Sequence, residues 1–389
     1  MISAGDGLAQ IALASRVYER SHAGWAVAVV FLAITVPIVL LAPAAGLLLD
    51  KVRPKPVLVA AAAAAACVTL ALVRVTGVAG TLLLAGGLGA CAAVLQPGLG
   101  AIVPRLAPPG RITRANSYLQ AATWAGMTAG PLLAGVLSAV GGTGLALAGN
   151  AATYALGAAG LALLRIADTD RAAGGAGQET MWTQIRAGLG YLRSDRTARL
   201  LTIVVGVMVA FAFLAVVAEV VLAQGVFHAG TGGYSVLVAS WTAGMVLGTL
   251  AAGPLPRRWL VPAALLGTVG TGLGIGLAGL APALWLSAAA YGIGGLSDGV
   301  EVLATRSYLN HHAPEALAGR VFALYSAVTF GAASAGMAAA SGLLGPLGAR
   351  TLLVIAGCGG IAAGSVGWLV HARAGRARLP GREHSLEPW

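Results

Sequence analysis

The sequence has 389 residues, of which 58% are hydrophobic and 10% are charged, against roughly 25% charged in an ordinary soluble domain. A chain of this composition has too little polar surface to cover a water-soluble globule, so we expect lipid to be its solvent. The net charge of +11 would indicate nucleic-acid binding in a soluble protein, but here the basic residues lie in alternate loops between apolar runs. The composition therefore predicts an all-α membrane protein without a nucleic-acid partner.

Apolar runs recur along the whole chain, and most reach the roughly 20 residues that one helical crossing of a bilayer needs. The first six lie near residues 2–18, 24–49, 57–76, 79–103, 116–140 and 143–165. The second six lie near residues 200–223, 234–256, 261–280, 282–305, 320–344 and 349–371. We therefore expect twelve transmembrane helices. The first run is short, so either the true start lies upstream or the first helix is incomplete.

The runs form two groups of six, and these groups predict the domain organisation. We expect an N-terminal six-helix bundle over residues 1–165, a C-terminal six-helix bundle over 199–371 and a cytoplasmic tail over 372–389. The stretch 166–198 is predicted to be a cytoplasmic linker, flexible where it is rich in Ala, Gly and acidic residues. Its second part predicts either an amphipathic helix on the membrane surface or a solvated connector helix, because apolar residues recur at helical spacing at Trp182, Ile185, Leu189 and Leu192.

The distribution of basic residues predicts the orientation of the spans. Most of the 24 lysines and arginines lie in the loops after the even-numbered runs and in the C-terminal tail. Cytoplasmic loops of membrane proteins carry an excess of such residues. We therefore expect a multi-pass protein of the inner (plasma) membrane, with both termini in the cytoplasm.

The two groups of runs also repeat each other at one constant offset. Repeated prolines, arginines and glycines keep this offset, as in the pairs Pro108 and Pro314, Arg114 and Arg320, Gly130 and Gly336, and Gly142 and Gly348. The repeat predicts two pseudo-symmetric six-helix bundles in parallel orientation, an arrangement found in transporters whose site lies between the two halves.

The loop after the second run packs an acid and three cations into a short turn. It reads Gly46-Leu47-Leu48-Leu49-Asp50-Lys51-Val52-Arg53-Pro54-Lys55. Gly46 and Asp50 share one helix face, so the glycine lets a neighbouring helix come close and the acid can cap its positive N-terminus. This spacing resembles the loop signature of the major facilitator superfamily of transporters. The resemblance implies a conformational latch that involves Gly46, Asp50, Lys51, Lys55, Arg114 and the helix that starts near Arg320; the alternative is an ordinary charged loop.

The fifth run extends the resemblance to the exporters of this superfamily. Four small or helix-bending residues, Gly126, Gly130, Pro131 and Gly135, resemble the antiporter motif that the family carries in helix five. Glycines at this spacing make a flat face for close packing, and the proline frees a backbone carbonyl and bends the helix. The alternative is generic small-residue packing in a glycine-rich chain.

Two further loops resemble the branch that contains the enterobactin exporter and related drug exporters. They lie at residues 103–117 and 313–323. Two features depart from the family pattern. Residues 82–95 contain no arginine where many drug–proton antiporters carry one in helix four, and the turn glycine of the loop signature is replaced around Arg53-Pro54.

Four acids lie within the apolar runs and are candidates for a proton or substrate site. An ionisable side chain inside a membrane span is costly and is by default a functional hypothesis. Asp298 and Glu301 share a helix face, and two close carboxylates repel each other when both are ionised, so such a pair is suited to carry a proton. Asp6 lies between two glycines in the first run, and Glu219 lies near the outer end of the seventh. The alternative for each is a hydrogen-bonded structural acid or one that reaches the membrane interface.

Polar and aromatic residues within the runs are candidates to line a central cavity. They are Gln96, Trp124, Asn150, Tyr154, Trp241, Tyr291 and Tyr325. An apolar, aromatic cavity with few polar groups suits amphiphilic cargo. For each aromatic residue alone, core packing or an interfacial belt is the alternative.

These patterns predict proton-coupled efflux of hydrophobic or amphiphilic small molecules, such as drugs, siderophores or natural products, by a monomeric secondary transporter. The direction of transport rests on the family resemblance. We expect no cofactor, no metal and no enzyme activity, since the sequence contains neither a phosphate-binding glycine loop nor a catalytic or metal-ligand cluster. The alternatives are a proton-coupled importer or uniporter, and a membrane sensor or scaffold that transports nothing.

Overall fold

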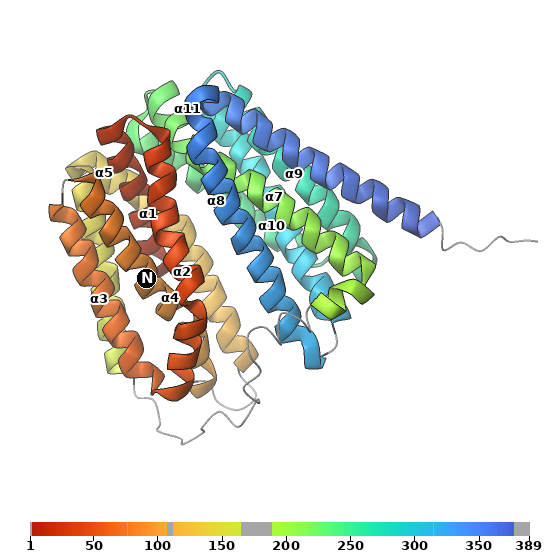
Figure 1. Ribbon diagram of the computed structural model, residues 1–389, viewed down its shortest axis with the longest axis horizontal. Helices are drawn as coiled ribbons and strands as arrows, with labels where there is room; N and C mark the ends of the chain where they lie inside the picture. Colours follow the sequence, from red (N-terminus) through yellow and green to blue (C-terminus); the bar gives the residue numbers. More distant parts are fainter. Residues whose placement is uncertain (1, 76, 107–111, 165–188, 314, 377–389) are drawn as a thin grey trace, which may run out of the picture.

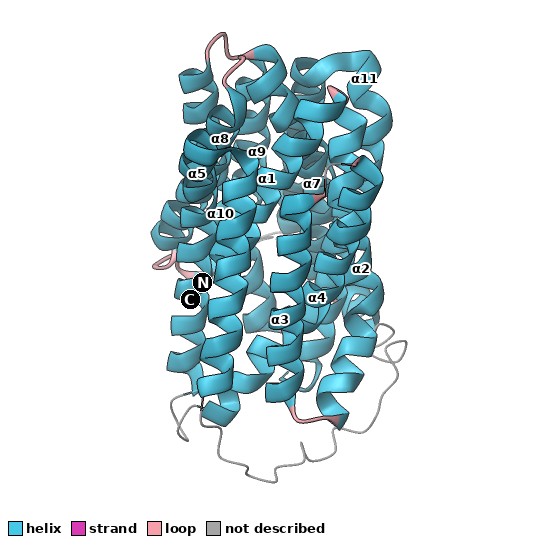
Figure 2. Ribbon diagram, turned by 90° about the vertical axis from the view of Figure 1, so that its left-hand side faces the viewer, coloured by secondary structure: helices cyan, strands magenta, loops and turns pink. Residues whose placement is uncertain are grey.

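The computed structural model describes residues 2–75, 77–106, 112–164, 189–313 and 315–376 (Figures 1 and 2). Within these ranges it describes the backbone alone at residues 42, 43, 46, 47, 50, 51, 100, 101, 103–106, 112–121, 124, 315–320, 323, 375 and 376.

The described residues are almost entirely helical and contain no strand. The α-helices are α1 (Ile2–Ser21), α2 (Gly24–Lys51), α3 (Pro54–Arg74), α4 (Val78–Leu106), α5 (Ile112–Leu163), α7 (Arg196–Val221), α8 (Gly230–Ala252), α9 (Leu260–Leu280), α10 (Leu284–His312) and α11 (Glu315–Arg376). A π-helix, η1 (Leu222–Val226), continues α7, and a 3₁₀ turn, η2 (Arg257–Trp259), precedes α9. Helices suit an apolar chain because they satisfy every backbone hydrogen bond within one segment, which lipid cannot do.

Eight helical stretches of the described chain are long and apolar enough to cross a membrane. Helices α1 and α10 are not among them. Charged residues lower the mean hydropathy of these two helices: Asp6, Arg16, Glu19 and Arg20 in α1, and Asp298, Glu301 and Arg306 in α10. The expected count of twelve spans is therefore not confirmed by length and composition of the elements.

Helices α5 and α11, of 52 and 62 residues, both reverse direction at glycines. In α5 the turn is at Gly142, whose φ is 70°. Leu137 and Gly149 flank it and would lie about 18 Å apart along a straight helix, yet the Leu137 side chain is 3.0 Å from where a Cβ on Gly149 would be. In α11 the turn is at Gly348, with φ 75°. Each element therefore consists of two antiparallel segments, which a sequence-based count treats as separate helices.

The helices pack as two bundles side by side, α1 to α5 in one and α7 to α11 in the other (Figure 1). The α1–α2, α3–α4 and α9–α10 turns and the glycine reversals lie at one end, which we call the upper end after its place in Figure 1. The α2–α3 and α8–α9 turns lie at the lower end. Large apolar side chains such as Leu83, Val140 and Leu163 are about 80% exposed, as expected for a surface that faces lipid.

An arginine caps the third helix of each bundle at the upper end. Arg16 of α1 donates to the carbonyl oxygen of Leu72, in the last turn of α3, at 2.5 Å. Arg350 of α11 donates to the carbonyl oxygens of Gly279 and Ala281, at the end of α9, at 3.1 and 2.7 Å. The carbonyls at a helix C-terminus carry partial negative charge, so a guanidinium stabilises them.

The two capping arginines come from different positions in the sequence repeat. Arg350 corresponds to Gly144 by the constant offset, and the Arg16 guanidinium lies 3.6 Å from where a Cβ on Gly144 would be. The same place beside the helix end is therefore filled from α1 in one bundle and from α11 in the other.

We predict that Arg16→Ala destabilises the N-terminal bundle and that a second substitution, Gly144→Arg, restores part of the loss. A hydrogen bond to a charged group contributes about 1.5–3 kcal/mol, so the melting temperature of the purified protein should fall clearly in the single variant and recover in the double variant. Arg74→Ala, which removes an exposed arginine from the same end of α3, is the control and should leave the melting temperature almost unchanged. A double variant no more stable than Arg16→Ala would contradict the equivalence of the two caps.

Candidate functional site

A cavity of about 220 Å³ lies between the two bundles. Four elements of one bundle and two of the other line it: Asp6, Ala9 and Gln10 of α1, Phe31, Ile34, Thr35 and Ile38 of α2, Leu88, Ala92 and Gln96 of α4, Tyr154 of α5, Phe213 and Val216 of α7, and Met337 of α11. Small-molecule sites usually measure about 300–1,000 Å³. A drug-sized ligand would therefore require the bundles to separate further.

Asp6 provides the charge of this cavity. It lies in the second turn of α1 and is exposed to the cavity. The buried phenol of Tyr154 donates a hydrogen bond to its Oδ1 at 2.5 Å, which fixes the carboxyl group against α5. Among the described lining residues Asp6 is the one acid, and none is Lys, Arg or His.

Sequence reasoning named three of the lining residues and missed most of the others. Asp6, Gln96 and Tyr154 were candidates, whereas the polar Gln10 and Thr35 were not. The apolar part of the lining had a signal that could have been used, because Phe31, Ile34, Thr35 and Ile38 recur at the spacing of one helix face. That pattern alone does not distinguish a cavity face from a packing face.

Several other cavity candidates lie in the packed interior instead. Asn150, Tyr291 and Tyr325 are buried and are not part of the cavity lining. Asn150 packs against Gly5 of α1, and its Nδ2 has no partner in the described structure. Trp241 packs edge-on against Tyr291, with ring centroids 5.8 Å apart. The side chain of the remaining candidate, Trp124, lies outside the described residues.

The acid pair of α10 lies apart from the cavity. Glu301 is 2% exposed, and its Oε1 accepts a hydrogen bond from Thr305 Oγ1 at 2.9 Å. Asp298 is half-buried, and both carboxylates are within electrostatic reach of Tyr325 on α11. The structure therefore brings this pair together but does not join it to Asp6.

Contacts between the bundles close the upper end. Gln224 of η1 donates to Ser15 Oγ of α1 at 2.7 Å, and Thr231 of α8 donates to Glu19 Oε1 of α1 at 3.2 Å. Gly225 packs directly against the Tyr18 phenol. We call this set of contacts the upper seal.

The charged motif at the lower end is only partly described. Gly46, Asp50 and Lys51 lie in α2, Arg114 in α5 and Arg320 in α11, but their side chains lie outside the described residues. Lys55 is described, and its Nζ donates to the carbonyl oxygen of Leu164 at 2.7 Å. This bond caps the end of α5 within the same bundle, so Lys55 has an interaction that the motif did not predict.

The glycines of the fifth-run motif lie at close helix contacts. Gly126 and Gly130 pack against the start of α1, where a Cβ on Gly130 would be 2.5 Å from the Ala4 carbonyl oxygen. Pro131 touches Gly7 on the same helix. Gly135 packs against Ser235 of α8 in the other bundle, where a Cβ would be 2.8 Å from the Ser235 Cβ. The motif therefore joins the first helix on one part of its face and the second bundle on another.

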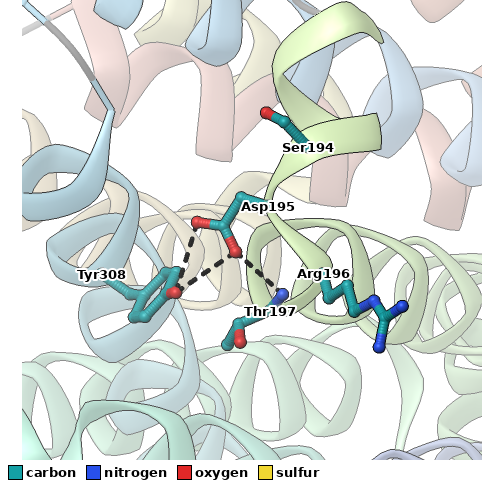
Figure 3. A pocket seen from close by; sticks show the side chains of 5 residues that line it. All are labelled: Ser194, Asp195, Arg196, Thr197 and Tyr308. Carbon is teal, nitrogen blue, oxygen red and sulfur yellow. Dashed lines mark hydrogen bonds between the residues drawn. The ribbon is translucent and has the colours of Figure 1, made fainter.

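A second pocket, of about 390 Å³, lies at the lower end of the second bundle (Figure 3). Its lining residues are Ser194, Asp195, Arg196, Thr197 and Tyr308. The Asp195 side chain caps α7 by accepting from the backbone N–H groups of Thr197 and Ala198 at 2.9 and 3.0 Å. Tyr308 of α10 also donates to this carboxylate, at 3.3 Å, as Figure 3 shows.

Tyr191, in the segment before α7, completes this cluster. Its hydroxyl group donates to Asp195 Oδ2 at 3.1 Å. Burial raises the pKa of Tyr191, and the negative charge of Asp195 raises it further. The phenol therefore stays protonated as a donor. Asp195 thus ties the linker end, α7 and α10 together.

We predict that Asp195→Ala lowers the stability of the protein by more than Asp195→Asn. An N-cap side chain contributes about 0.5–2 kcal/mol, and asparagine caps about as well as aspartate. Thermal unfolding of the two variants in the same detergent measures the difference. Equal melting temperatures for both variants would show that the cap is not what Asp195 supplies.

The two bundles of membrane-length helices, with a largely apolar cavity between them, define the class of the protein as a membrane carrier. The model of the Major Facilitator Superfamily matches residues 2–259, about two thirds of the chain, and the chain belongs to this family. No curated protein matches the sequence.

Solved structures with the same fold are transporters of different kinds. A mutant of the nucleoside transporter NupG is 14% identical with a TM-score of 0.76, over 95% of this chain and 96% of that one. A bacterial homologue of the iron transporter ferroportin in an inward-facing state is 14% identical with a TM-score of 0.70, over 94% and 95%. A bacterial homologue of the human lysosomal transporter Spinster, inward-facing and unoccupied, is 16% identical with a TM-score of 0.70, over 97% and 96%. At this identity the likeness establishes the fold alone.

Proposed function

We propose that this member of the Major Facilitator Superfamily is a proton-coupled exporter of hydrophobic or amphiphilic small molecules, with a monomer as its working unit. The observation that carries this proposal is the cavity between the bundles, in which an apolar lining surrounds Asp6. A site between two halves can face each side of the membrane in turn when the halves rock against each other.

The proposed membrane topology has twelve crossings, with α5 and α11 crossing twice each around Gly142 and Gly348. The halves comprise residues 1–165 and 199–371, joined by the cytoplasmic linker 166–198. We place the lower end and both termini in the cytoplasm of the cell and the upper end outside, because most basic residues lie in the lower loops. The upper seal then closes the outer side.

The charge of the cavity narrows the proposed cargo. An acid without a cation among the described lining residues attracts positive charge and repels negative charge. Phe31, Ile34 and Phe213 supply apolar and aromatic surface. Neutral or cationic amphiphiles, such as drugs and other natural products, therefore suit the cavity better than anionic compounds.

Asp6 is the proposed acid at which proton and cargo exchange. A carboxyl group that faces a cavity can release its proton to water or to a cation that replaces it. Tyr154 holds the carboxyl group in place in either charge state, since a phenol can donate to a carboxylate and accept from a carboxylic acid. Asp298, Glu301 and Glu219 are proposed as further proton-carrying acids within the second half.

The inner latch proposed from the sequence completes the cycle. Asp50 at the end of α2 would cap the start of α11, near Arg320, when the inner side closes. Gly46 would let the two helices approach, and Lys51 and Arg114 would supply the surrounding cations. The glycines of the fifth-run motif would act on the other side of the same movement, because Gly126 and Gly130 contact α1 and Gly135 contacts α8.

We predict that the purified protein in liposomes exchanges protons for a hydrophobic cationic dye when a proton gradient is imposed. We also predict that Asp6→Asn strongly reduces this exchange. A hydrogen bond to a charged group contributes about 1.5–3 kcal/mol, so cargo-driven proton release should fall at least about tenfold, since tenfold corresponds to 1.4 kcal/mol. Dye fluorescence and internal pH, followed with and without a protonophore, measure the exchange.

Asp195→Asn provides the matched control, because it makes the same acid-to-amide change away from the cavity, and asparagine caps a helix about as well as aspartate. It should keep proton release within a factor of about two, since the two residues differ little as helix caps. Flux that persists with a protonophore and follows the cargo gradient would favour a uniporter, and uptake in right-side-out vesicles would favour an importer. Absence of flux for every compound in a broad panel would favour a sensor or scaffold.

A further inference from the structure

A second polar cluster lies within the second bundle, directly beneath the upper seal. Glu219, in the last turn of α7, is 8% exposed. Tyr234 of α8 and Tyr291 of α10 lie beside it and are both fully buried. This cluster is separate from the central cavity, to which none of the three residues contributes.

The two phenol groups lack regular hydrogen bonds. The Tyr234 hydroxyl has no hydrogen-bond partner in the described structure and interacts with Glu219 only through its charge. The Tyr291 hydroxyl is within side-chain hydrogen-bonding reach of the Glu219 carboxyl group but outside ordinary hydrogen-bond geometry. Buried hydroxyl groups are nearly always paired, because leaving one unpaired costs about 1–3 kcal/mol. These hydroxyl groups can therefore form additional hydrogen bonds in another state of the protein.

Among the described residues, the titratable groups that interact with Glu219 are the phenols of Tyr234 and Tyr291, and no cation is among them. Three charged groups at the upper end have other partners: Arg350 binds the end of α9, Arg16 binds the end of α3, and Glu19 accepts from Thr231. An ionised carboxylate buried without a cation is costly, because it loses its hydration without compensation.

The helices that hold the cluster also make the upper seal. Gln224, which donates a hydrogen bond to α1, lies in the π-helix η1 that continues α7 just after Glu219. Thr231, which bonds to Glu19, lies one turn before Tyr234 on α8. Opening the upper end requires η1 and the start of α8 to leave α1, and water can then reach the cluster. π-Helical segments in α-helices are frequent at functional sites.

We propose that Glu219 is a proton switch for the outer seal. The carboxyl group holds a proton while the seal is closed and gives it to outside water when the seal opens, and the ionised form keeps the seal open until a proton returns. Tyr234 and Tyr291 donate to the carboxylate in the open state. This inference rests on the proposed orientation and deepens the proposed function by adding a gate. Glu219 releases and regains its proton on the outer side and so sets when the seal opens, whereas the proton exchanged for cargo is bound at Asp6.

The test measures the seal itself and does not depend on any cargo. In a variant whose three native cysteines are replaced, Ala223→Cys places a thiol at a buried position of η1 and leaves the Gln224–Ser15 and Thr231–Glu19 hydrogen bonds of the seal in place. A membrane-impermeant maleimide reports how often this thiol is exposed from outside. Pro282→Cys, in the exposed α9–α10 turn, corrects for the pH dependence of the thiol reaction. The purified protein in liposomes is labelled over a range of external pH.

The corrected labelling rate should rise with external pH, because loss of the proton from Glu219 favours the open seal. We expect a change of about fivefold or more, the usual lower range of coupling between two linked equilibria. In Glu219→Gln, which cannot ionise, the rate should be independent of external pH. The proposal is overturned if the corrected labelling rate still depends on external pH in Glu219→Gln. It is also overturned if this rate does not depend on external pH in the cysteine reporter with native Glu219.

Two further variants protect the test against misfolding. Glu219→Asp should retain the pH dependence, because it keeps the ionisable group, and Tyr291→Phe should reduce it by removing one donor to the carboxylate. Asp195→Asn, at the start of α7 and far from the seal, makes the same acid-to-amide change and should retain it. If the protein moves no cargo but Ala223→Cys still responds to external pH through Glu219, the exporter proposal fails and the switch stands.

Discussion

The cost of placing polar groups where water is absent governs this structure. Lipid and tightly packed helices surround most of the described chain, so each polar group needs a partner within the protein. The backbone finds its partners within helices. The buried Arg16 donates to the end of α3, Glu301 accepts from Thr305, and Tyr154 donates to Asp6. The positions of these few polar side chains therefore decide where helices meet and where a ligand can be received.

Glycine sets how closely the helices meet, and this fixes the shape of each bundle. In the second bundle, a Cβ on Gly295 of α10 would lie 2.0 Å from the Trp241 carbonyl oxygen of α8, a contact that no other residue permits without movement. The contacts between the bundles combine such glycine packing, at Gly135 and Gly225, with the hydrogen bonds of the upper seal.

The two bundles are similar in sequence pattern but unequal in chemistry. The first contributes the one acid of the cavity lining, Asp6, whereas the second holds Glu219, Asp298 and Glu301 away from the cavity. The arginine caps show the same inequality, since α1 supplies one and α11 the other. The ends of the third helices therefore carry an arginine cap in both bundles, although the capping arginine comes from a different helix in each.

Much of the fold could be predicted from the sequence, and less of the site. The apolar runs predicted helices where α2, α3, α4, α8 and α9 lie, because hydrocarbon length and hydropathy are local properties of the chain. The number of helical elements does not give the number of crossings, because α5 and α11 each reverse direction at a glycine, Gly142 or Gly348, without an intervening loop. For the cavity, the sequence singled out Asp6, Gln96 and Tyr154 because polar residues are rare in such runs. It could not separate them from Asn150 and Tyr291, which are equally polar and lie in the packing.

The sequence by itself determined that this chain resides in a membrane, how its hydrophobic segments are spaced, and which few ionisable groups lie within them. These properties follow from composition and from neighbours along the chain. Only the tertiary structure decided that Asp6 faces a cavity, that Arg16 and Arg350 cap equivalent helices, and that Glu219 lies with two phenols beneath the seal. The reason is physical: the environment of a buried charge is set by side chains from other helices, and which helices meet depends on packing between residues far apart in sequence.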